Sequence, residues 1–171
     1  GVGLGDRVSL PGHKFGGPKG AGALVVRDGV PMAAVLRGGG RERDRRAGTQ
    51  NVPAIVGLGE AARLVQADRE ATVRRIGALR DRLEGGLLAT VDGVQRTVPD
   101  GTPRTPGVAH LCISGVESEA LLFLLERHGL SASAGSSCAS GAQEPSHVLA
   151  ALGVDRTAAL RSVRLSLGHA S

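Results

Sequence analysis

Apolar side chains recur every three or four positions between residues 53 and 87, which is the spacing of a helix with one buried face. Pro53 suits the first turn of such a helix, because the N–H that proline lacks has no partner there. The pattern predicts two successive helices, one around Ile55, Leu58, Ala62 and Val65, the other around Val73, Ile76, Leu79, Leu83 and Leu87. Gly85 and Gly86 weaken the end of the second helix.

Short apolar and β-branched runs on both sides of these helices predict strands. They lie at 23–27, 108–113 and 163–167, and 131–134 is a further short candidate. Two more helices are expected, at 117–128 before Gly129 and at 145–152 before Gly153. This alternation of strands and helices predicts an α/β or α+β architecture.

Four segments are too rich in glycine, serine or charge to form packed elements. They lie at 12–22, 37–48, 91–105 and 135–144, and we expect loops there. Residues 1–10 show no capped element, so we expect the chain to begin within a fold and further sequence to precede it.

The formal net charge of +5 does not by itself predict nucleic-acid binding. Arginines are interleaved with carboxylates along the helical segments, which is typical of solvated helix faces. Aromatic residues make up 1% of the chain, with no Trp or Tyr, so base-stacking platforms are lacking. No long apolar run predicts membrane insertion, and Cys112 and Cys138 lack metal-ligand spacing. We expect a cytoplasmic protein without a metal site, direct nucleic-acid contacts or a membrane span.

Lys14 is a candidate for cofactor chemistry. It follows His13 in the sequence PGHKFGGPKG, where glycines allow backbone amides to approach an anion and the imidazole offers another donor. A nucleotide phosphate loop is excluded, because Lys19 is followed by Gly20 and not by Ser or Thr. The residues alone leave open that Lys14 is an ordinary surface lysine.

Two further positions stand out from their surroundings. Cys138 lies among small polar residues in SAGSSCAS, so it is either a reactive thiol or a simple exposed one. Cys112 lies in an apolar run and is expected to be a small buried side chain. Arg164 interrupts the apolar run SVRLSLG, and we expect it at a sheet edge or beside a carboxylate, internal or from a ligand.

Four segments, 12–27, 38–61, 133–153 and 162–168, together resemble the ordered motifs of pyridoxal-phosphate-dependent cysteine desulfurases of the NifS/IscS type, within the class V aminotransferase superfamily. The resemblance implies the α/β fold of PLP-dependent transferases, fold type I. Residues 1–68 would be the end of the large PLP-binding domain. Residues 69–171 would be a small α/β carboxy-terminal domain that carries the cysteine loop.

The resemblance also implies a role for each candidate residue. Lys14 matches the lysine that holds pyridoxal 5'-phosphate covalently, and His13 matches a contact to its phosphate. Thr49 matches a threonine that reaches the phosphate bound by the neighbouring subunit, which implies a homodimer. Arg164 matches the arginine that binds the substrate carboxylate, and Cys138 matches the nucleophile.

The implied reaction converts L-cysteine to L-alanine and leaves a persulfide on Cys138. The sulfur would pass to an acceptor protein, such as an iron–sulfur scaffold or a tRNA-thiolation enzyme. Two positions depart from the family pattern: Pro11 replaces a serine that contacts phosphate, and Arg37 replaces a histidine. The family's cofactor-stacking histidine and the aspartate that holds the pyridine nitrogen would precede residue 1.

Two other functions fit the same sequence. One is a related lyase that acts on selenocysteine, which would prefer selenium to sulfur in turnover. The other is a truncated, non-catalytic module that dimerises or binds a scaffold.

Overall fold

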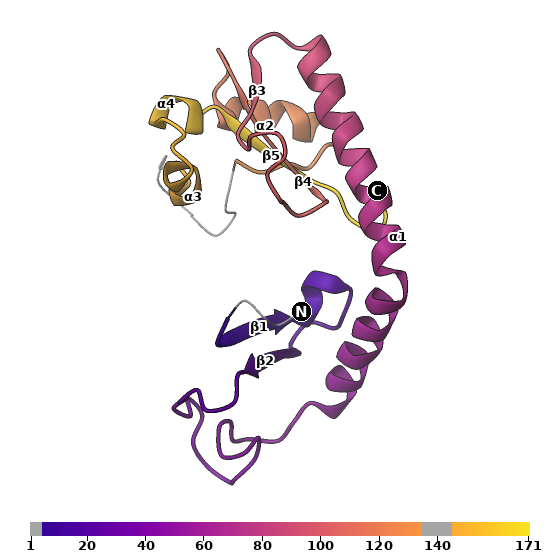
Figure 1. The fold of residues 1–171 in the computed structure, drawn as a ribbon, viewed down its shortest axis with the longest axis vertical. Helices are drawn as coiled ribbons and strands as arrows, with labels where there is room; N and C mark the ends of the chain where they lie inside the picture. The colour runs from indigo at the N-terminus through magenta and orange to yellow at the C-terminus, as the bar shows by residue number, and fades with distance from the viewer. Residues whose placement is uncertain (1–4, 135–144) are drawn as a thin grey trace. The chain divides into compact units, whose positions relative to one another are not determined.

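The computed structural model describes residues 5–134 and 145–171. The chain divides into two compact units, Gly1–Arg69 and Glu70–Ser171. The long helix α1 (Val52–Thr90) contributes its first half to one unit and its second half to the other (Figure 1). None of the helices in the described residues combines the length and the apolar character needed to cross a membrane.

The first unit is built on a two-stranded antiparallel hairpin. Strand β1 (Arg7–Pro11) pairs with β2 (Gly22–Val26), and the four-residue 3-10 helix η1 (Gly12–Phe15) follows β1 directly. Strand β1 was not among the predicted strands, because residues 1–10 were described only as lacking a capped element. The backbone hydrogen bonds of β1 come from its pairing with β2, and the sequence of this short run does not by itself indicate that pairing. An ion pair of 2.9 Å between Arg27 and Asp6 lies just beyond the paired residues.

Residues 37–48 form an irregular loop, as expected. A single bridge joins Leu36 to Arg46. Three consecutive residues other than glycine, Glu42, Arg43 and Asp44, adopt left-handed backbone angles with φ of 51°, 55° and 60°. Such angles are costly for residues that carry a Cβ atom.

The prediction of two helices between residues 53 and 87 was wrong, because α1 is one helix of 39 residues. The connecting segment QADREAT (66–72) contains neither Gly nor Pro and is rich in helix-forming residues, so nothing ends the helix there. The expected buried face is also incomplete, since Ile55 and Val65 are 45% and 44% exposed. In the first half of α1, Gly57 instead lies close to Pro18 and Leu58 lies close to Gly12.

The second unit is built on a three-stranded antiparallel sheet of order β3–β4–β5. The strands are β3 (Val94–Arg96), β4 (Val108–Ile113) and β5 (Ser162–Ser166). The first of these was not predicted, because three residues in a turn-rich segment carry no periodicity. The candidate strand at 131–134 is reduced to one bridge, between Ser133 and Arg164.

The described residues of the second unit also form three short helices: α2 (Ser118–Arg127), α3 (His147–Ala151) and α4 (Arg156–Ala159). The first two correspond to expected helices. The third was missed, and it is begun by Asp155, whose carboxylate accepts hydrogen bonds from the backbone N–H groups of Thr157 and Ala158.

The two faces of the sheet differ in character. Ala109 and Leu111 on β4 and Val163 on β5 lie on one face and are buried, forming an aliphatic core as the scarcity of aromatic residues requires. The alternate residues along β4 and β5 lie on the other face, and these include His110, Cys112 and Arg164.

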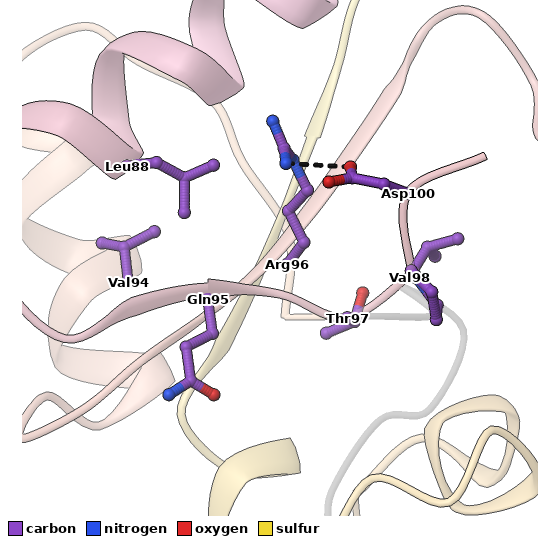
Figure 2. A pocket seen from close by; sticks show the side chains of 8 residues that line it. Leu88, Val94, Gln95, Arg96, Thr97, Val98 and Asp100 are labelled. Atoms are coloured by element: carbon purple, nitrogen blue, oxygen red, sulfur yellow. Dashed lines mark hydrogen bonds and ion pairs between the residues drawn. The ribbon is translucent and has the colours of Figure 1, made fainter. Parts of the chain in front are cut away.

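A buried carboxylate joins the end of α1 to β3. Glu84 is fully buried and receives two hydrogen bonds of 2.7 Å from Arg104 and one of 3.2 Å from Arg96. Figure 2 shows Arg96 also reaching Asp100, at 2.9 Å, while Gln95 points to the opposite side of the strand. We call Glu84, Arg96, Asp100 and Arg104 the Glu84 cluster. Burial alone would raise the pKa of Glu84, but the hydrogen bonds and charges of the two arginines outweigh it and hold the pKa below its usual value.

Candidate functional site

The turn that carries Lys14 depends on glycines at close backbone contacts. A Cβ atom on Gly12 would lie 2.9 Å from the carbonyl oxygen of Ala21 and 3.0 Å from a methyl carbon of Leu58. Gly16 ends η1 with a left-handed φ of 87°, and Gly17 donates a hydrogen bond of 2.9 Å to the oxygen of Gly12. The local sequence therefore folds into a tight turn that other residues could not form without strain.

This turn brings His13 and Lys14 together at the end of η1. Both side chains are exposed. Two basic side chains beside backbone amides of glycine form a suitable setting for an anion. Pro11 precedes the turn and supplies no side-chain cap, in keeping with its lack of both a hydroxyl group and an N–H.

Thr49 lies in the same unit, in the loop that precedes α1. Its side chain is exposed and it follows Gly48, which adopts a φ of 95°. Side-chain hydrogen bonds hold this loop, from Arg46 to the carbonyl oxygen of Gly48 at 3.3 Å and from Arg41 to Gln50 at 3.2 Å. An exposed hydroxyl on a braced loop is available to a neighbouring molecule, and its role toward a second subunit remains a prediction.

Arg164 lies on β5, in the second unit. Its backbone exchanges hydrogen bonds with Ser133, at 2.6 and 3.1 Å, and the register places it opposite His110 of β4. The Nε atom of Arg164 is buried and has no hydrogen-bond partner among the described residues. A buried donor without a partner is costly, so this atom is suited to receive an acceptor from a ligand. Both expected alternatives, a sheet edge and a ligand carboxylate, remain compatible with this position.

His110 was missed by sequence reasoning. Its ring nitrogen Nδ1 lies 3.1 Å from the hydroxyl of Thr97, and the imidazole is half-buried beside Arg164. Burial and the charge of Arg164 together lower the pKa of His110. The available signal was a polar residue within the apolar run VAHLCI, and only strand register could link it to Arg164.

Cys112 is half-buried on β4, whereas we expected a buried side chain. Burial and the nearby Asp155 carboxylate raise the pKa of its thiol, which makes it a poor nucleophile. Cys138 lies outside the described residues. His13, Lys14 and Thr49 belong to one unit and Arg164 to the other, so their assembly into one site remains a prediction.

An open pocket of about 360 Å³ lies beside β3 and is shown in Figure 2. Its charged residues are Arg96 and Asp100, and Arg96 already pairs with both Asp100 and Glu84. The charged residues that line this pocket therefore belong to the Glu84 cluster, where they stabilise the fold.

Comparison with known proteins agrees with the resemblance in the sequence. The family model for class-V aminotransferases matches residues 5–171. A cysteine desulfurase of Rhodobacter capsulatus is 52% identical over 162 residues, which are 95% of this chain and 42% of that protein. An IscS-like cysteine desulfurase of Mycobacterium tuberculosis is 46% identical over 164 residues, which are 96% of this chain and 42% of that protein.

Solved structures show the same relationship. A NifS-like protein from Rickettsia africae superimposes with a TM-score of 0.83 at 30% identity, over 97% of this chain and 43% of that one. A second NifS-like protein gives a TM-score of 0.81 at 34% identity, over 96% of this chain and 41% of that one. The mixed helix and sheet of this chain is thus a part of the PLP-dependent transferase fold.

The chain spans about 42% of the length of these cysteine desulfurases. The family match, in contrast, extends over nearly all of the chain and includes the turn of Lys14 and the strand of Arg164. The chain belongs to the class-V aminotransferase family.

Proposed function

We propose that this chain is part of a pyridoxal-phosphate-dependent cysteine desulfurase that converts L-cysteine to L-alanine and transfers the sulfur to Cys138. The observation that carries the proposal is the identity of 46–52% to cysteine desulfurases over 95–96% of the chain. Residues 1–68 would contribute to the PLP-binding domain and residues 69–171 would form the small domain with the cysteine loop.

The turn of Lys14 fits a phosphate-bearing cofactor. Gly12 and Gly17 bring backbone so close together that a Cβ on Gly17 would lie 3.0 Å from the oxygen of Gly12. The exposed side chains of His13 and Lys14 supply a donor and an amine at the end of this turn. Lys14 would hold the cofactor covalently, and His13, together with the partner subunit's copy of Thr49, would contact its phosphate.

Pyridoxal phosphate, when bound, would supply an electron sink that withdraws electrons from the substrate and allows the C–S bond at Cβ to break. Arg164 would bind the substrate carboxylate, a task for which a planar guanidinium is suited. The Cys138 thiolate would attack the substrate sulfur, so that an S–S bond forms as the C–S bond breaks. The substrate carbon takes up a proton and leaves as alanine, and Cys138 carries the persulfide.

Turnover by the protein that carries this chain tests the proposal. With L-cysteine and pyridoxal phosphate, we expect alanine and persulfide in equal amounts in a single turnover, and loss of both in Cys138→Ser. Cys112→Ser should keep turnover within about twofold, since its thiol is a poor nucleophile. Alanine formation that survives in Cys138→Ser would contradict the assignment, and a preference for selenocysteine would favour the related lyase.

The proposal extends to partners. A homodimer would let Thr49 of one subunit serve the cofactor of the other, and an acceptor protein, such as an iron–sulfur scaffold or a tRNA-thiolation enzyme, would take the sulfur. A reducing cytoplasm would keep both cysteines as thiols. Sedimentation of the holoprotein tests the dimer. A Thr49→Ala variant should dimerise normally and bind the cofactor more weakly.

A further inference from the structure

The backbone geometry makes His110 and Arg164 a close cross-strand pair. The N–H and C=O groups of Arg164 point to Ser133, while the carbonyl oxygen of His110 points to Thr97 of the segment after β3. The two residues are opposite one another in the register but exchange no backbone hydrogen bonds. In antiparallel sheets such pairs have the shorter Cα separation, near 4.5 Å, and their side chains lie on the same face.

Thr97 fixes the imidazole of His110. The Thr97 hydroxyl donates to the carbonyl oxygen of His110 at 3.1 Å and lies 3.1 Å from its Nδ1 atom. The Thr97 hydroxyl can donate to Nδ1 or accept from it, so either tautomer of the neutral ring can make the second contact. Both contacts come from Thr97, and together they hold the imidazole in one orientation.

The charged and titratable groups on this face can be named element by element. Among the described residues, β5 contributes Arg164, β4 contributes Cys112 beside Asp155, and the β3 side contributes the uncharged Gln95 and Thr97. No carboxylate among the described residues pairs with Arg164, whose Nε atom is buried without a partner. Because burial and Arg164 both lower the pKa of His110, the imidazole is neutral at neutral pH.

From this arrangement we propose that His110 is a positioning residue for Arg164. Its neutral imidazole, held by Thr97, limits the orientations of the guanidinium and directs it toward a substrate carboxylate. This inference rests on the proposed function only for the identity of the substrate. An acidic residue at position 110 would neutralise Arg164, and a flexible one would leave its guanidinium free to move, since the Cβ atoms of directly opposite residues in such a pair lie about 4.5–5.5 Å apart.

Nuclear magnetic resonance titration of the five histidine rings tests the pairing without any turnover. His110→Asn identifies the His110 signal by its absence. In Arg164→Gln we expect the pKa of His110 to rise, because a neighbouring positive charge has been removed, and in Arg164→Lys we expect it to stay close to its original value. An unchanged pKa in a folded Arg164→Gln protein would overturn the proposal.

Kinetics of the holoprotein then separate positioning from simple folding support. His110→Leu and Thr97→Val should raise the KM for L-cysteine about tenfold with kcat within about twofold, since substrate binding is weakened by about one hydrogen bond to a charged group. His110→Asn should restore the KM, because its amide can form a hydrogen bond with Thr97 in place of Nδ1. An unaltered KM in His110→Leu would refute the proposal.

The two sets of results distinguish this inference from the proposed function. Alanine formation that does not depend on Cys138 would contradict the proposed desulfurase function, whatever the pKa of His110. Desulfurase activity together with an uncoupled His110 would contradict only the positioning role.

Discussion

At the scale of single residues, the backbone angles at a position decide how well a given residue fits there. Gly12, Gly16 and Gly17 form a turn that requires glycine, and the turn presents Lys14. Asp44 shows the reverse, because it carries a Cβ at a φ of 60° that glycine adopts more readily.

Replacing Asp44 by glycine should therefore stabilise the protein. Left-handed angles cost residues with a Cβ about 1–2 kcal/mol, and the greater freedom of glycine in the unfolded chain offsets part of the gain. We expect Asp44→Gly to raise the free energy of unfolding by about 0.5 kcal/mol in denaturant titrations. Asp28→Gly is the matched control in an exposed turn without positive φ at that aspartate, and it should be neutral or destabilising. A loss of stability in Asp44→Gly would contradict the argument.

The thiol of Cys112 should react slowly with alkylating agents. Its pKa is raised by burial and by Asp155, so little thiolate is present at pH 7. Mass spectrometry after limited treatment with iodoacetamide should find Cys138 labelled before Cys112, and Asp155→Asn should speed labelling of Cys112. Faster labelling of Cys112 than of Cys138 in the folded protein would count against the nucleophile assignment.

At the scale of elements, the continuity of α1 is the main departure from expectation. Ala67 is exposed at the centre of the segment that we expected to separate two helices. Because a proline removes a helical hydrogen bond and clashes with the preceding turn, Ala67→Pro should destabilise the protein by about 3 kcal/mol, and Ala67→Gly by about 1 kcal/mol. Circular dichroism during thermal unfolding would measure both. Equal stability of all three proteins would mean that the helix is interrupted in solution.

The Glu84 cluster should be the most sensitive contact between helix and sheet in the second unit. Glu84→Gln leaves two arginines around a neutral side chain, and breaking a buried ion pair costs about 3 kcal/mol or more. Glu70→Gln is the control on the same helix, because the Glu70–Arg74 pair is exposed and separated by 3.6 Å. We expect the control to change the free energy of unfolding by less than about 0.5 kcal/mol. A similar small change in Glu84→Gln would refute the structural role of the cluster.

At the scale of the whole molecule, the same carboxylate predicts part of the response to acid. The folded-state pKa of Glu84 lies below its unfolded value of about 4.3, so its contribution is fully present above that pH and is lost as the pH falls through the folded-state pKa. Stability measured from pH 7 to pH 3 should therefore fall less steeply in Glu84→Gln than in the unaltered protein. Parallel curves would contradict this.

Much of the local structure could be predicted from sequence. The glycine turn, the Gly-rich loop, strand β4 and helix α2 follow from spacing and turn residues within a few positions, because those signals act over short stretches of chain. The family was also evident from four ordered motifs, and the family match over residues 5–171 confirmed it.

Only the tertiary structure decided which distant residues meet. His110 and Arg164 are paired by strand register, and Glu84 is enclosed by Arg96 and Arg104 from a segment with no clear periodicity. Local propensity depends on neighbours in sequence, whereas register and burial depend on hydrogen bonds and packing between segments far apart in the chain. The sequence by itself therefore determined the family, the turns and the helices α2 and α3. The pairing of His110 with Arg164 came from strand register, and the burial of Glu84 came from the packing of α1 beside β3.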